Sequence, residues 1–238
     1  MSCDSEHVAE GDCSDLTLEE RVNMFGIYLE GEWNDEDLLQ ILEAVSLIGF
    51  KFSIAMGNQG SQHINTFKSV FEGIIFSLDP GLAAKGLYGQ SKGNRVSLLP
   101  KKVTNRLIAH ELGHTFSYRM WNASGGTYAD NHPEVFLGYG LYDESGAFMT
   151  GDNGTSYSRN NGTQGLSSGY SCSTVPCQYH FYKSDGSLMA GALTASEEWA
   201  DMFLNWSKGG FTNSSHGVFY ANWMTTNMSE WISIASGG

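Results

Sequence analysis

Two histidines and a glutamate lie close together in the segment Leu107–Phe116, which reads Leu-Ile-Ala-His-Glu-Leu-Gly-His-Thr-Phe. His110 and His114 are four residues apart, so on a helix their rings lie one above the other and one metal ion can bridge them. Glu111 follows at about 100° around the helix axis, beside the histidine pair but not part of it. In that position its carboxylate can hold a water molecule at the metal and accept its proton. The motif predicts a catalytic zinc ion with Glu111 as general base.

A catalytic zinc site needs a third protein ligand and keeps its fourth position for water. Glu197 and Asp201 form a Glu-x-x-x-Asp pair on a later predicted helix, so both carboxylates lie on one helical face. Glu197 could bind the metal, while Asp201 accepts the other N–H of a liganding histidine. The alternative third ligands are Asp130 and a loop histidine, His132 or His180.

The His110-Glu111-x-x-His114 motif, together with Glu197-x-x-x-Asp201, resembles the gluzincin zinc metallopeptidases, the class that includes thermolysin and the anthrax lethal factor protease. The resemblance covers these two short motifs. It implies a zincin-like fold and hydrolysis of peptide bonds. It also implies that His110, His114 and Glu197 bind zinc, that Glu111 is the base, and that Asp201 orients a ligand.

Two other metallopeptidase patterns fit less well. Residue 120 is methionine, where the metzincin pattern has a third histidine. The segment Gly126-Thr127-x-x-Asp130 is similar to the start of the aspzincin signature, but Pro133 and Glu134 follow in place of its Tyr-Gly. The aspzincin resemblance would make Asp130 the third ligand, and it stays the second choice.

Length and composition predict one sizeable folded domain spanning residues 1–238. Of the 238 residues, 41% are hydrophobic and 16% are charged, which is enough apolar material for a core. The net charge of −13 argues against a nucleic-acid binder, and we expect no apolar run long enough to span a bilayer. Residues 1–50 hold 13 of the 26 acidic residues but only one basic residue, Arg21, and we expect an acidic helical segment there.

Four cysteines form two local pairs, Cys3 with Cys13 and Cys172 with Cys177, and we expect each pair to form a disulfide. The alternative for the second pair is a further metal site with His180. Disulfides and a middle region rich in Gly, Ser, Asn and Tyr favour a secreted protein. The first residues lack the basic and apolar regions of a signal peptide, so we expect any such peptide to have been removed.

The helices and strands predicted from the sequence form an α+β domain with an active-site helix, a small sheet and a long irregular insertion. Apolar periodicity and capping residues predict helices at residues 17–29, 34–48, 103–119 and 196–206. Alternating patterns predict strands at residues 50–54 and 95–99, and residues 64–75 fit either a helix or a strand. No period is visible in residues 122–191, the Gly-, Asn- and Ser-rich insertion, and a last apolar segment contains Trp223 and Trp231. We expect strand 95–99 to be the edge at which an extended substrate pairs.

The sequence therefore predicts a secreted zinc-dependent metalloendopeptidase that acts on a protein or peptide substrate. One alternative is a secreted binding domain with a structural zinc ion, but such a site would be closed by a fourth protein ligand and would have no use for Glu111. The other is a zinc hydrolase that cleaves non-peptide amides. A donor to the developing oxyanion is also needed, and spacing does not select among Tyr118, Tyr139, Tyr142, Tyr182 and His180.

Overall fold

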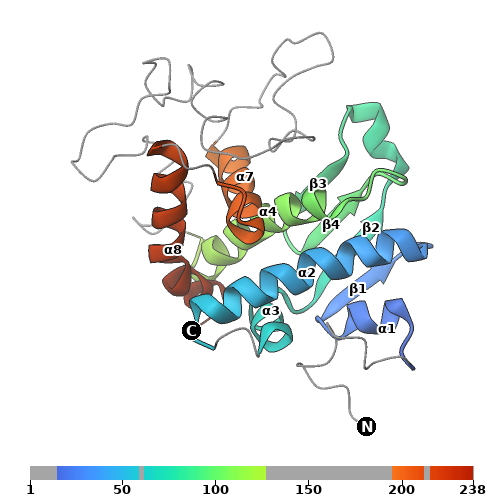
Figure 1. The fold of residues 1–238 in the computed structure, drawn as a ribbon. Coiled ribbons are helices and arrows are strands. Elements are labelled where there is room, and N and C mark those ends of the chain that lie inside the picture. The colour runs from blue at the N-terminus through green and yellow to red at the C-terminus, as the bar shows by residue number, and fades with distance from the viewer. Residues whose placement is uncertain (1–14, 59–61, 127–194, 212–214, 238) are drawn as a thin grey trace.

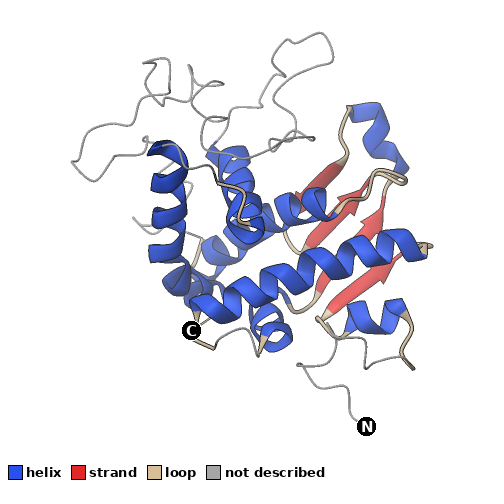
Figure 2. Cartoon of the chain, viewed as in Figure 1, coloured by secondary structure: helices blue, strands red, loops and turns tan. Residues whose placement is uncertain are grey.

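Residues 15–58, 62–126, 195–211 and 215–237 are described by the computed structural model. In this part of the chain, helices pack on a four-stranded sheet that contains both parallel and antiparallel strand pairs (Figure 1, Figure 2). The α+β class predicted from the sequence is therefore confirmed for the described residues. The following predicted positions lie outside them: Cys3, Cys13, Asp130, His132, Tyr139, Tyr142, Cys172, Cys177, His180 and Tyr182.

The N-terminal helix α1 (Leu18–Asn23) is shorter than predicted. It begins at Thr17, whose hydroxyl accepts the N–H of Glu20, while the Glu20 carboxylate accepts the N–H of Thr17. Gly26 then has a φ of 76°, a left-handed conformation that an α-helix cannot continue. The second half of the predicted helix is therefore wrong, and Ile27–Glu30 forms strand β1.

Helix α2 (Asp35–Ala55) begins where predicted but continues through Gly49. The strand predicted at residues 50–54 is wrong, because these residues form the last turns of the helix. A β-carbon at Gly49 would overlap the carbonyl oxygen of His63. The glycine is thus a packing position and not a helix end, since it lets helix α3 (His63–Phe71) lie close to α2.

Among the described helices, α2 is long and apolar enough by length and composition to cross a membrane, with a mean hydropathy of 1.6. The expectation that no apolar run is long enough to span a bilayer is therefore wrong for α2, by length and composition. Half of the apolar window is buried inside the fold, where α2 contacts α1, α3 and helix α4 (Asn105–Ala123). Packing of these helices therefore accounts for the buried half of the window.

The sheet has the strand order β1-β2-β4-β3. β1, β2 (Ile74–Leu78) and β4 (Arg95–Leu98) are parallel neighbours, and β3 (Gly89–Lys92) pairs with β4 in the antiparallel direction. The segment 64–75 thus divides between α3 and β2. The strand predicted at residues 95–99 is confirmed, but its expected place at an edge is wrong because β3 covers it. The edge strand β3 was missed, since its sequence Gly-Gln-Ser-Lys has no apolar alternation.

Helix α4 crosses the middle of the fold, with the sheet on one side and two later helices on the other (Figure 1). It begins at the predicted cap residue, Thr104, whose hydroxyl accepts a backbone N–H of the first turn. Helix α7 (Ala195–Lys208) packs on α4, and α8 (Ser215–Ala235) contacts both. The helices predicted at residues 103–119 and 196–206 are confirmed.

Buried aromatic side chains hold α4 and α7 together. The ring of Phe116, on α4, is fully buried and lies 5.4 Å from the ring of Phe203 and 5.9 Å from that of Trp199, both on α7. The rings of Phe52 and Phe71, from α2 and α3, lie 5.5 and 6.3 Å from the ring of Phe116. Contacts of this size and geometry fix the relative position of the helices, and the two predicted site motifs lie on α4 and α7.

Candidate metal centre

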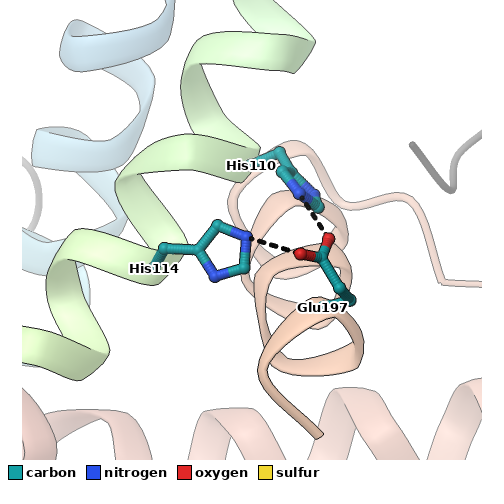
Figure 3. Close-up of side chains that lie close together, drawn as sticks. All are labelled: His110, His114 and Glu197. Atoms are coloured by element: carbon teal, nitrogen blue, oxygen red, sulfur yellow. Dashed lines mark ion pairs between the residues drawn. The ribbon is translucent and has the colours of Figure 1, made fainter. Parts of the chain in front are cut away.

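Three side chains from two helices meet at one point in the fold (Figure 3). His110 and His114 project from successive turns of α4, with their ring centroids 4.9 Å apart. Glu197, in the first turn of α7, faces both rings: its Oε2 lies 3.3 Å from His110 Nε2, and its Oε1 lies 3.6 Å from His114 Nε2. One ligand atom from each residue lies within 4.8 Å of the others, so the three residues can hold a metal ion.

Gly113, between the two histidines, allows α7 to come this close. A β-carbon at residue 113 would lie 2.9 Å from the Cα atom of Ala200 and 3.1 Å from the Cβ atom of Phe203. The carbonyl oxygen of Gly113 accepts the indole N–H of Trp199 at 2.8 Å. Trp199 lies two residues after Glu197, so the helix contact at Gly113 also places the carboxylate.

The second nitrogen of each histidine ring has its own partner on α7. Nδ1 of His110 donates to Oδ1 of Asp201 at 2.8 Å, and Nδ1 of His114 lies 3.1 Å from Oγ of Ser196. Both contacts turn Nε2 toward Glu197 and fix the ring orientation, as outer hydrogen bonds do at metal sites. Asp201 is fully buried, which makes its contact a rigid one.

The sequence predicted the place of Asp201 but did not find Ser196. Asp201 follows Glu197 by one helical turn, and that spacing is a local signal. Ser196 precedes Glu197 directly, and nothing in its spacing connects it to His114, which is 82 residues away. Its only signal was a hydroxyl beside a predicted ligand.

Glu111 is buried at 3% exposure and packs against strand β3. A β-carbon at Gly89 would overlap Oε1 of Glu111, so the carboxylate occupies the space that a side chain at residue 89 would need. The hydroxyl of Ser91, two residues along the strand, lies 2.8 Å from that of Thr115 on α4. These contacts hold β3 against α4 beside the two histidines.

The charges at the centre shift the pKa values of its members in opposite directions. Burial raises the pKa of Glu111, against the attraction of His110 and His114. Burial also opposes the charged forms of His110 and Glu197, but hydrogen bonding outweighs it in both. Contacts with Asp201 and Glu197 raise the pKa of His110 to about 10, and contacts with both histidines hold the pKa of Glu197 well below its usual range. Without a metal, these contacts favour a charged His110 between the carboxylates of Asp201 and Glu197.

A cleft of about 520 Å³ lies at the centre, between β3, α4 and the start of α7. Its lining includes His110, Glu111, His114 and Glu197, together with the edge strand from Gly89 to Ser91. A molecule in the cleft can therefore contact the histidines, both carboxylates and the backbone of β3 at once.

The structure brings five of the predicted residues together: His110, Glu111 and His114 on α4, and Glu197 and Asp201 on α7. Of the tyrosines considered as oxyanion donors, Tyr118 lines the same cleft. The alternative ligand Asp130 lies outside the described residues. Searches for similar proteins found no matching family model, no matching curated protein and no matching solved structure.

Proposed function

We propose that this chain is a secreted zinc-dependent metallopeptidase that hydrolyses internal peptide bonds of a protein or peptide substrate. One observation carries the proposal: three donor atoms from His110, His114 and Glu197 converge, while the buried carboxylate of Glu111 faces the same cleft without belonging to the donor group. Three ligands with an adjacent carboxylate are what water-activating zinc enzymes use. The proposal includes a zincin-like fold, which the packing of the motif helix on a small mixed sheet supports.

The donor set suits zinc in chemistry and in spacing. Two imidazole nitrogens and one carboxylate oxygen form a ligand set of catalytic zinc sites. Ligands about 2.0 to 2.1 Å from a tetrahedral ion lie about 3.3 Å from each other. Oε2 of Glu197 lies 3.3 Å from Nε2 of His110, and Oε1 lies 3.6 Å from Nε2 of His114. One ligand atom from each of the three residues lies within 4.8 Å of the others, so the side chains must draw closer together to bind the ion.

A bound zinc ion would supply Lewis acidity and would lower the pKa of a coordinated water to about 7. Glu111 accepts the proton of the attacking water and delivers it to the nitrogen of the departing amine. Burial raises the pKa of Glu111, which makes its carboxylate a stronger base. Asp201 and Ser196 keep both imidazoles oriented throughout.

Strand β3 supplies a place for the peptide backbone. It is the sheet's edge on the side of α4, and its residues Gly89, Gln90 and Ser91 line the cleft. A peptide that adds to this edge as a further strand would lie beside Glu111 and the histidines, with its main chain held by hydrogen bonds that do not depend on its sequence. This arrangement favours peptides over small amides as substrates.

The burial of Glu111 also argues against a purely structural zinc ion. A carboxylate that is 3% exposed costs free energy in its charged form, and a structural centre would gain nothing from it. An active-site base explains why the residue is there.

The test combines metal analysis with proteolysis. Purified protein should contain about one zinc per chain, and should digest casein in a reaction that a chelator stops and added zinc restores. Glu111→Gln should keep the metal and lose the proteolysis. Protein that binds no transition metal in stoichiometric amount would refute the proposal. Protein that binds zinc but cleaves neither casein nor any peptide tested would refute the peptidase function and leave a structural centre or a hydrolase of non-peptide amides.

A further inference from the structure

The face of α4 that bears the two histidines continues as an aromatic face. Tyr118 follows His114 by four residues, and Trp121 follows Tyr118 by three. The side chains of Tyr118 and Trp121 therefore lie on the same side of the helix as those of the two histidines. Tyr118 and Trp121 line the same cleft as the histidines. Their ring centroids are 6.1 Å apart. We call this pair the aromatic wall.

Strand β3 runs alongside α4 at the cleft. Gly89 lies against Glu111, Ser91 bonds Thr115, and Gly93, just past the end of the strand, lies against Tyr118. Two residues of an extended strand span about 6.6 Å, close to the about 6 Å that four residues of a helix span. The strand and the helix therefore run side by side in the same direction. The cleft between them leads from the metal centre to the aromatic wall.

Gly93 leaves room at that end of the cleft. Its φ is 61°, and a β-carbon there would lie 3.6 Å from Tyr118 Cζ and 3.8 Å from its hydroxyl oxygen. Any larger side chain at residue 93 would therefore cover the tyrosine. Tyr118 is 38% exposed and lines the same cleft as the carboxylates of Glu111 and Glu197. An apolar surface within a binding cleft is where an apolar group of a ligand is bound.

We propose, on the basis of the peptidase function above, that Tyr118 and Trp121 bind a large apolar, preferably aromatic, side chain of the substrate peptide. The distance sets its position relative to the cleaved bond. From Glu111 to Tyr118 the helix rises by about 10 Å, and an extended peptide covers about 3.3 Å per residue. The bound side chain therefore belongs to a residue two or three positions from the bond that is cleaved, on the side of the cleft toward Tyr118.

The first experiment scans one aromatic residue along a peptide. A series of quenched fluorescent peptides carries phenylalanine at each of three positions on either side of the cleavage site, with alanine elsewhere. Zinc-loaded protein should prefer phenylalanine at one outer position, by about 10- to 100-fold in kcat/KM over alanine, the range expected for filling an apolar pocket. Tyr118→Ala and Trp121→Leu should each remove most of this preference, with the zinc content unchanged.

Two control variants separate the aromatic ring from other effects. Tyr118→Phe keeps the ring and should keep the preference. Tyr28→Ala removes a tyrosine that is 64% exposed on β1, at the opposite edge of the sheet, and should change nothing. The second readout is binding without turnover. In a Glu111→Gln background, the phenylalanine peptide should bind about 10-fold more tightly than its alanine counterpart, and Tyr118→Ala should remove the difference.

The outcomes distinguish this inference from the function on which it rests. If zinc-loaded protein cleaves no peptide and no casein, the peptidase proposal fails. If it cleaves peptides but shows no aromatic preference, or if Tyr118→Ala and Trp121→Leu retain that preference, the aromatic wall does not bind a substrate side chain. The peptidase proposal is then unaffected. If Tyr118→Phe lowers kcat equally for all peptides, the hydroxyl acts on the reacting carbonyl and the assignment of a side-chain site is overturned.

Discussion

Gly89→Ala tests the position of the general base without changing any predicted ligand. The glycine lies on edge strand β3, and a β-carbon there would overlap Oε1 of Glu111 and lie 2.9 Å from both Cδ and Cγ. Ordinary van der Waals contact begins at 3.4 Å, so Cδ and Cγ of Glu111 must move about 0.5 Å away from the new β-carbon, and Oε1 must move further. The carboxylate end of a glutamate side chain can rotate, and it gives way more readily than the strand.

The expected result is a folded, zinc-binding and nearly inactive protein. A misplacement of about 1 Å at a reacting group costs roughly 100-fold in rate. Gly89 is not among the glycines with a positive φ, so alanine fits its backbone and by itself favours the strand by about 0.5 to 1 kcal/mol. We therefore expect kcat to fall by about 100-fold while the melting temperature changes by only a few degrees.

The assay measures kcat, zinc content and melting temperature for the wild type, Gly89→Ala and Lys92→Ala. Lys92 is an exposed residue of the same strand, and its replacement should leave all three quantities near their wild-type values. Full activity in Gly89→Ala would show that the carboxylate does not work from its observed position. Loss of zinc from this variant, with the fold intact, would show that the strand contact supports the ligands and not the base.

Glu111→Gln should retain zinc and the fold but lower kcat by at least about 10²- to 10⁴-fold, because the amide cannot accept a proton; a fully active variant would refute the base assignment. Glu197→Ala should weaken zinc binding more than Asp201→Asn, for which about 10- to 100-fold is expected, and equilibrium dialysis would contradict the ligand set if the order were reversed. Raising the pH from about 5 to about 8 should increase the rise in melting temperature that zinc causes, because zinc and protons compete for His110. Burial opposes the charged form of His110, but hydrogen bonds with Asp201 and Glu197 raise its pKa to about 10 in the metal-free protein. The folding stability from these contacts is therefore complete below 6.5, the pKa of histidine in the unfolded chain, and is lost as the pH rises through about 10. A zinc effect independent of pH would contradict this linkage.

The local sequence determined the helices of the site and the order of groups on them. The spacing of His110, Glu111 and His114 sets their angular relation on any α-helix, and Thr104 marks where that helix begins. The same holds for Glu197 and Asp201 on α7. Such signals are reliable because helical periodicity and capping depend on residues three or four apart.

Local signals of this kind also gave a wrong prediction, the end of a helix at Gly49. Gly49 looked like a helix end, because glycine is a poor helix former and usual at helix ends. In the structure it lies within α2, where the absence of a β-carbon allows contact with His63 of α3. A glycine that ends a helix and one that allows close packing look the same in sequence, and only the neighbouring element distinguishes them.

Only the tertiary structure decided which groups face each other across the site. The contact of His110 with Asp201 joins residues 91 positions apart, and that of His114 with Ser196 joins residues 82 apart. Strand β3 has a polar sequence with no periodic signal, yet its Gly89 borders the carboxylate of Glu111. These relations depend on how closely α7 and β3 approach α4. The buried aromatic core and the lack of a side chain at Gly113 and Gly89 set these distances. The spacing of residues along the chain does not predict them.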